Sequence, residues 1–385
     1  MKLHSSFAVA AAALAALALT SCQSKEPAKT DSGSKSGPAE INVTASDTTC
    51  ELSGTEGPTG TNTFVITNNG TRVTEFYVYG EGHRVMGEVE NISPGLQRKL
   101  SVQLGEPGTY QTACKPGMVG DGIRGDFKVT GGSVKIDDAG KFNEASESYK
   151  RYVSSQTDAL VAATQIFVDA VKKGDVNAAK TQFPTARTYY ERIEPVAESF
   201  PNDLDPRIDL REANLEPGQK WTGFHRLEKD LWVTGLQPDS DAMADQLTAD
   251  VKELDNGVKA PTWTTDSTQI AGGAQGLLDE ISRSKITGEE DTFGHTDLWD
   301  FKANVDGSQT AVASVRPILD ERNAALGKKV DQRFADVGAL LEKYHQGDGF
   351  VFYDRVTEPQ RQELSRAIDA LSKEVSQVQG VIAPQ

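Results

Sequence analysis

His225 and Glu228 are the residues whose types and spacing most directly suggest chemistry. They lie three positions apart, and residues at i and i+3 are neighbours on one face of a helix. An imidazole and a carboxylate directed at one spot suit a divalent or trivalent metal ion that accepts nitrogen and oxygen ligands. Taken alone, the same spacing is also explained by a hydrogen bond or an ion pair on a helix face, without a metal.

The apolar residues around this pair recur at helical spacing. Phe224, Leu227 and Leu231 follow the three- and four-residue period, which predicts a helix over residues 218–234. The imidazole and the carboxylate then lie at the border of the buried stripe. This is where a helical bundle builds a site from inward-facing side chains.

Helical periodicity extends over the rest of the chain from residue 143. The first predicted helix is long and ends at Gly174, and no strand pattern interrupts those that follow. Thr357 and Gln360 have the spacing of a capping box for the last one. The other helices are predicted over residues 178–200, 218–234, 239–258, 267–286, 297–326, 329–344 and 358–378. Residues 143–385 therefore predict an all-α bundle.

Residues 40–130 have a period of two instead. Segments such as Lys-Leu-Ser-Val-Gln-Leu at 99–104 alternate, and turn signals such as Asn-Asn-Gly at 68–70 separate them. Six or more short strands in this length predict a small β-sandwich. The glycine-containing segment 131–142 is predicted to be a linker. The predicted fold class is multidomain β + α, with the sandwich preceding the bundle.

The N-terminal 39 residues have the pattern of a targeting segment and a tether rather than of a folded domain. Residues 1–22 combine Lys2 with a short apolar run that ends in Leu-Thr-Ser-Cys22, which resembles a bacterial lipobox. Cys22 is then the acylated first residue of an extracytoplasmic, lipid-anchored protein. Ordinary secretion is the alternative, and it leaves Cys22 as a free thiol. Residues 23–39, rich in Ser, Gly, Lys and Pro, predict a flexible tether.

Charge and missing motifs exclude two classes of function. The chain has 40 Lys+Arg against 56 Asp+Glu, a net charge of −16, whereas a nucleic-acid-binding face is basic. The acidic balance is consistent with cation binding and equally with a solvated surface. The sequence contains neither His-Glu-x-x-His nor Gly-x-Ser-x-Gly, so no catalytic residue is assigned and an enzyme is not expected.

The wider string around the metal-type pair resembles a family signature. Gly223-Phe-His225-Arg-Leu-Glu228 is similar to the Gly-x-His-x-x-Glu motif of imelysin-like proteins. The order of lipobox, β-domain and helical domain resembles the EfeO-type iron-uptake proteins. The resemblance implies a cupredoxin-like sandwich followed by an imelysin-like bundle. It also implies capture of ferrous or ferric iron outside the membrane in an EfeUOB-type system, together with a membrane permease and a haem-containing peroxidase.

The resemblance also implies that carboxylates from distant helices complete the site. One acidic stretch, 202–209, offers Asp205 and Asp209; the other, 286–301, offers Glu289 and Glu290. With one imidazole these make a set suited to iron, for which zinc is a surrogate. Acidic turns are also commonly solvated helix caps.

Cys50 and Cys114 are the cysteines that remain besides Cys22. In an exported protein such a pair is most simply a disulfide. The resemblance implies a second site, for copper or iron, formed by Cys50, Glu75, Glu88, Glu90 and Cys114. A blue-copper site is not expected, because no His follows Cys114 in Lys-Pro-Gly-Met. Disulfide and metal site both remain open.

Two other functions are compatible with the pattern. Imelysin-like proteins have been grouped with peptidases, and β-sandwiches bind sugars. A peptidase-related protein and a metal-dependent polysaccharide-binding protein are therefore the alternatives to iron capture.

Overall fold

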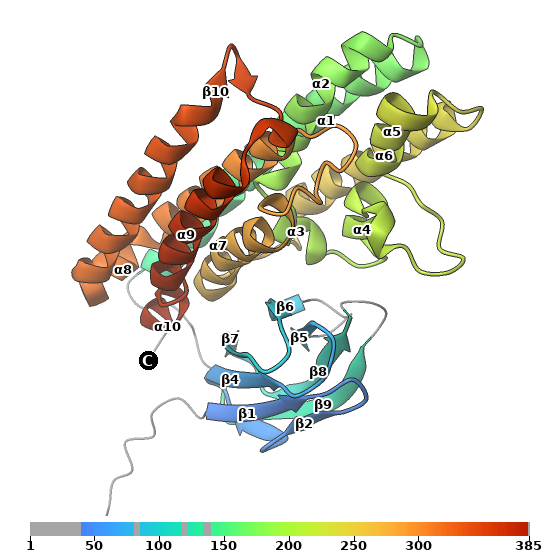
Figure 1. The fold of residues 1–385 in the computed structure, drawn as a ribbon. Helices are drawn as coiled ribbons and strands as arrows, with labels where there is room; N and C mark the ends of the chain where they lie inside the picture. The colour runs from blue at the N-terminus through green and yellow to red at the C-terminus, as the bar shows by residue number, and fades with distance from the viewer. Residues whose placement is uncertain (1–39, 81–84, 118–121, 134–139, 384–385) are drawn as a thin grey trace, which may run out of the picture. The chain divides into compact units, whose positions relative to one another are not determined.

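The computed structural model describes residues 40–80, 85–117, 122–133 and 140–383 (Figure 1). The predicted signal peptide, the tether and the lipidation site Cys22 lie outside these residues, as does part of the predicted linker. Among the described helices, none has the length and apolar character needed to cross a membrane.

The described residues of the N-terminal β-domain form nine strands. They pair in two sheets, in the orders β2-β1-β4-β7 and β3-β9-β8-β5-β6. The strands are β1 (Glu40–Ala45), β2 (Cys50–Leu52), β3 (Glu56–Pro58), β4 (Gly60–Asn68), β5 (Thr74–Tyr79), β6 (Val85–Ile92), β7 (Gln97–Leu104), β8 (Gly108–Pro116) and β9 (Ile123–Thr130).

Alternation along the strands produces the core between the two sheets. In β1 the side chains of Ile41, Val43 and Ala45 are buried while their neighbours are exposed. Phe64 from one sheet packs against Phe76 of the other, with ring centroids 5.2 Å apart. Residues of both sheets therefore form one apolar cluster, as in a sandwich with one inner face per sheet.

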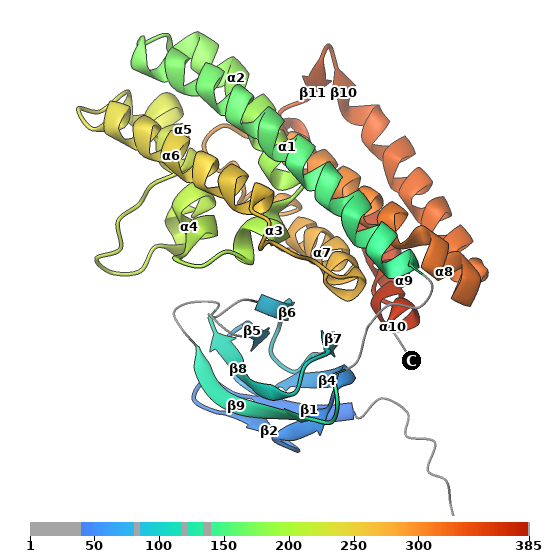
Figure 2. The same cartoon turned by 180° about the vertical axis from the view of Figure 1, so that it is seen from behind.

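The helical domain follows the linker. Its long helices are α1 (Lys141–Lys172), α2 (Val176–Glu191), α6 (Ser240–Lys259), α7 (Ser267–Glu280), α8 (Asp297–Leu341) and α9 (Glu358–Val375). Shorter helices are α3 (Glu194–Glu198), α4 (Leu204–Asp209), α5 (Phe224–Lys229) and α10 (Val378–Ile382). Figure 2 shows α1 running along α6 and α2, while α8 contacts α7 and α9. The predicted fold class, a β-domain followed by a helical domain, is confirmed.

Several boundaries differ from the prediction. Residues 297–326 and 329–344 were expected to form two helices, and α8 does contain two helices, which meet at the non-helical residue Asn323 (φ −156°, ψ 71°) rather than at residues 327–328. A short hairpin, β10 (His345–Gln346) and β11 (Gly349–Phe350), interrupts a region where no strand was expected. At α9 the predicted capping interaction is present, since the Gln360 side-chain oxygen accepts a hydrogen bond from the Thr357 N–H at 2.8 Å.

Two helices change to π-helical turns near the site residues. α5 continues as a π-helical turn over Asp230–Thr234, and α7 continues as one over Ile281–Lys285. Such turns are uncommon and often occur at functional sites. Here they follow His225 and Glu228 on one side and precede the acidic loop 286–296 on the other.

Candidate metal centre

A glycine allows the helix that carries His225 to approach its neighbour closely. Gly223 precedes α5 with φ 88° and ψ −167°, a conformation open essentially to glycine. A Cβ at this position would lie 2.1 Å from the carbonyl oxygen of Ile208 in α4. The missing side chain therefore lets the first turn of α5 approach α4, whose last residue is Asp209.

Glu228 holds one side of the His225 ring. Its Oε2 lies 2.9 Å from His225 Nδ1. Its Oε1 accepts hydrogen bonds from the backbone N–H groups of Phe293 at 2.8 Å and Gly294 at 2.7 Å. Both carboxylate oxygens are thus engaged, and the side chain is fully buried. A carboxylate on the second ring nitrogen is the usual way in which proteins orient a histidine ligand.

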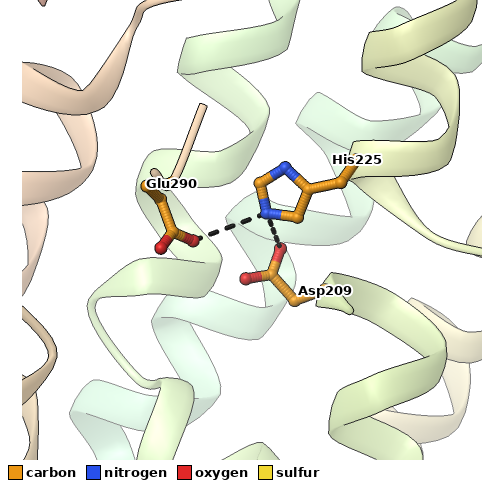
Figure 3. A group of neighbouring side chains, drawn as sticks. All are labelled: Asp209, His225 and Glu290. Carbon is orange, nitrogen blue, oxygen red and sulfur yellow. Dashed lines mark ion pairs between the residues drawn. The ribbon is translucent and has the colours of Figure 1, made fainter. Parts of the chain in front are cut away.

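The other ring nitrogen faces two carboxylates. His225 Nε2 lies 3.6 Å from Asp209 Oδ1 and 3.4 Å from Glu290 Oε1, as Figure 3 shows. Nε2 is buried and makes no hydrogen bond within the described part of the chain. The three atoms come from α4, α5 and the loop before α8. They lie close enough together to be ligands of one ion.

A second group of potential ligands shares the same imidazole. It consists of His225, Glu228 and Asp291, with Asp291 Oδ1 3.9 Å from Nδ1. In this group Glu228 already makes three hydrogen bonds, and Asp291 Oδ1 lies farther from the ring than either carboxylate oxygen at Nε2 does. Within the described residues, only these two groups have three potential ligands close together.

The structure sorts the predicted acidic residues into those near the ring and those away from it. Asp209 and Glu290 face His225, whereas the Glu289 side chain is exposed. Asp205 accepts a hydrogen bond from Tyr190 OH and belongs to neither ligand group. The structure thus places Glu289 and Asp205 away from the ring. Three consecutive acidic residues in a loop give no period from which the inward-facing one could be predicted.

Sequence reasoning missed Asp291 as a potential ligand and the buried cations Arg187 and Lys285. Both cationic side chains are 0% exposed. Arg187 forms ion pairs with five carboxylates: those of Glu191, Asp209, Glu290, Asp291 and Asp300. The available signal was its place on the apolar stripe of α2, one turn after Phe183, where a charged residue needs a buried partner.

The two carboxylates at Nε2 are held in their ionised form. Burial opposes ionisation of Glu290, but Lys285 and Arg211 hold its pKa well below the usual value. Burial also opposes ionisation of Asp209, but the charge of Arg187 keeps the pKa of Asp209 below its usual value. Both groups are therefore anionic at neutral pH without a metal ion.

His225 itself is held in its protonated form. Burial and the charge of Arg187 both lower its pKa, but Asp209 and Glu228 outweigh them and raise the pKa well above that of a free imidazole. The metal-free site thus contains an imidazolium, with Nδ1–H directed at Glu228. A metal ion that binds Nε2 must replace the proton on that nitrogen.

The predicted second site in the β-domain does not assemble. Cys50 and Cys114 form a disulfide, with Cα atoms 5.6 Å apart, so neither sulfur is a free thiolate. Cys114 is paired with Phe76, which faces the core, whereas Glu75 is the neighbour of Phe76 and points to the opposite face. Glu88 pairs with Tyr77 on that same opposite face. The side chain of Glu90 lies outside the described residues.

Comparisons with known proteins place this architecture. Residues 145–378 match the imelysin family model, and residues 10–129 match the model of a cupredoxin-like domain. The iron uptake system component EfeO of Escherichia coli O157:H7 is 38% identical over 352 residues, which cover 89% of this chain and 91% of that protein. The chain belongs to the imelysin family, and within it to the EfeO-type proteins.

Two further relatives agree with this assignment. The proteins of the same name from Escherichia coli K12 and Shigella flexneri match this EfeO-type chain at 38% identity over the same length. The solved structure of auracyanin from Roseiflexus castenholzii matches 25% of the chain with 16% identity and a TM-score of 0.21. The family resemblance seen in Gly-x-His-x-x-Glu and in the domain order is confirmed.

Proposed function

We propose that this chain is the extracytoplasmic iron-binding component of an EfeUOB-type uptake system. The observation that carries the proposal is the buried Nε2 of His225, which makes no hydrogen bond in the described residues and faces two carboxylates. One imidazole with two or more carboxylate oxygens suits ferrous or ferric iron, and Zn²⁺ is a redox-inert surrogate. The relatives named as iron uptake components support iron as the cargo.

In this proposal each residue has a separate role. His225, Asp209 and Glu290 supply ligand atoms to the iron. Glu228 is a positioning residue that fixes the ring through Nδ1, and Asp291 lies on the far side of the ring. The chain carries out no catalysis of its own, and it passes the bound iron to a membrane permease. The haem-containing peroxidase of the same system is its other partner.

The location of the ion at Nε2 is tested by two sets of isosteric variants. Asp209→Asn and Glu290→Gln should each lower the affinity for Zn²⁺ or anaerobic Fe²⁺ by about 100-fold or more, since they remove an anionic ligand. Asp291→Asn should have a much smaller effect. Even the loss of an orienting partner lowers metal affinity 10- to 100-fold, so Glu228→Gln should fall in that range.

Calorimetric titration of the folded protein distinguishes these results. His345→Ala is the control, because His345 is exposed and lies on β10, and this variant should bind as the wild type does. If Asp291→Asn abolishes binding while Asp209→Asn does not, the ion lies at Nδ1 instead. If His225→Ala binds iron as tightly as the wild type, the assignment of the site is wrong.

The location of the protein at a membrane is proposed from the sequence alone. Cys22 is the acylated first residue that anchors the protein to a membrane through the tether. Cys22→Ala should release the protein from the membrane fraction or leave it unprocessed. Normal membrane retention of that variant contradicts the lipoprotein assignment.

A further inference from the structure

The fully buried side chain of Arg187 occupies the centre of the acidic cluster. It projects from α2, and its guanidinium lies 5.8 Å from the ring centroid of Phe183 and 5.7 Å from that of Phe224. Its Nε lies 3.0 Å from Asp300 Oδ2 and 3.3 Å from Asp291 Oδ1. The guanidinium is thus held by aromatic faces and carboxylates together, with no access to solvent.

Arg187 uses the same oxygen atoms that face His225. Its Nη1 donates to Asp209 Oδ1, and its Nη2 donates to Glu290 Oε1 at 3.0 Å. These are the two atoms that lie 3.6 and 3.4 Å from His225 Nε2. A metal ion at Nε2 and the guanidinium of Arg187 therefore require the same two oxygens.

The second buried cation of the cluster differs in this respect. Lys285 Nζ lies 3.1 Å from Glu191 Oε2 and 3.4 Å from Glu290 Oε2. It carries the same unit charge, is equally buried, and contacts the oxygen of Glu290 that faces away from His225. Lys285 consequently neutralises the cluster without occupying the ligand atoms.

We propose that Arg187 is an internal counter-cation that competes with the metal ion for Asp209 Oδ1 and Glu290 Oε1. The inference rests on the proposed function, because it assumes that the ion binds at Nε2. In the metal-free protein the guanidinium keeps the ligand carboxylates ionised and in place. Without a counter-cation, two buried carboxylates would be strongly destabilised by desolvation and by their mutual repulsion. Metal capture then includes displacement of the guanidinium from these two oxygens.

This competition makes Arg187 a determinant of selectivity. A monovalent cation brings no more charge than the guanidinium and lacks its several directed hydrogen bonds. An ion of charge two or three brings more charge to the same oxygens and can displace it. Arg187 therefore favours highly charged ions over the abundant monovalent ones and limits the affinity for the ion that it admits.

The test compares Arg187→Gln with Lys285→Gln, each titrated with Zn²⁺ in the full chain. Each variant removes one buried positive charge, but only the first frees the ligand oxygens. Arg187→Gln should bind Zn²⁺ about tenfold or more tightly than the wild type, because one hydrogen bond to a charged group outweighs a factor of ten in affinity. Lys285→Gln should show a smaller gain. Arg187→Lys, which keeps the charge but cannot bridge both oxygens, should lie between Arg187→Gln and the wild type.

Equal or weaker binding by Arg187→Gln overturns the inference, and so does an equal gain in Lys285→Gln, which would show an effect of charge alone. If Arg187→Gln does not fold without metal, Zn²⁺ should restore a cooperative thermal transition; no rescue overturns the proposal. In a Zn²⁺-soaked wild-type crystal the guanidinium should no longer contact both oxygens, and retention of both contacts beside a bound ion contradicts the proposal.

The same experiments separate this inference from the proposed function. If the wild type binds Zn²⁺ and His225→Ala does not, while Arg187→Gln shows no gain, only the competition is disproved. If the wild type and His225→Ala bind equally, the site itself is wrong and the inference falls with it. The double variant His225→Ala/Arg187→Gln should bind no Zn²⁺, which shows that the gain arises at this site.

Discussion

The helical domain and the β-domain both bury potential metal ligands, but within the described residues only the helical domain brings three of them close enough together to hold one ion. Near His225, a ring nitrogen that makes no hydrogen bond within the described part of the chain faces two carboxylates. In the β-domain the sulfurs of Cys50 and Cys114 are bonded to each other, and Glu75 points to the opposite face of its sheet. The difference follows from backbone geometry. A spacing of three places helical residues on one face, whereas neighbours on a strand face opposite ways.

The largest expected effect comes from breaking the close approach that builds the helical site. Gly223→Ala places a Cβ 2.1 Å from the carbonyl oxygen of Ile208, so α4 and α5 must separate. We expect a loss of metal affinity together with a fall in unfolding free energy. Gly218→Ala is the matched control: Gly218 also has a positive φ, 87°, but nothing lies within 4 Å of its added Cβ. The control should cost about 1–3 kcal/mol from backbone strain alone.

Calorimetry and chemical denaturation of both variants measure this effect. Gly223→Ala should lose more stability than Gly218→Ala and should alone lose metal affinity. Equal behaviour of the two would show that contact between α4 and α5 does not position the ligands.

The next effect tests the β-domain side of the comparison. The double variant Cys50→Ser/Cys114→Ser opens a loop that spans a sequence separation of 64 residues, which should lower stability by about 2–4 kcal/mol. Metal affinity of the helical site should not change. Thiol titration of the denatured, unreduced protein should detect neither cysteine. Two reactive thiols together with a loss of metal binding in the variant would restore the ligand interpretation.

A smaller effect is expected from the pH dependence of metal binding at His225. Because His225 has a raised pKa and must lose a proton to bind metal, metal affinity should fall about tenfold per pH unit below that pKa. The stability of the metal-free protein should depend on pH in the opposite direction and decrease as pH rises. The stabilisation from the raised pKa is fully present below about pH 6.5, the usual value for histidine, and is lost as pH rises through the folded value.

Zn²⁺ calorimetry in buffers of different ionisation enthalpy measures the protons released. One proton per ion is expected from His225 below its folded pKa. Release of no proton anywhere between pH 5 and pH 8 would mean that the ring is neutral before the metal binds.

The smallest effect is expected within the acidic loop itself. Glu289→Gln should leave metal affinity unchanged, because its side chain is exposed, whereas its neighbour Glu290 faces His225 at 3.4 Å. Titration of Glu289→Gln beside Glu290→Gln checks this directly. A comparable loss in both variants would mean that the loop presents a different face to the metal.

The sequence by itself determined the period of each domain, and with it the order of sandwich and bundle. It also determined that His225 and Glu228 share a helix face, because that relation depends only on local geometry. Gly223 belongs to the same local signal, although only the structure shows that the carbonyl of Ile208 is what it must approach.

Only the tertiary structure decided which carboxylates meet the ring. Asp209 and Glu290 lie 16 and 65 residues from His225 along the chain, and no periodicity links a loop residue to a helix that distant. The same holds for four of the five carboxylate partners of Arg187, which come from α4, from the loop before α8 and from α8. Only Glu191, four residues away on α2, is a local partner. Burial and the neighbouring charges together set the charge of such a cluster, and both depend on packing between elements rather than on any one of them.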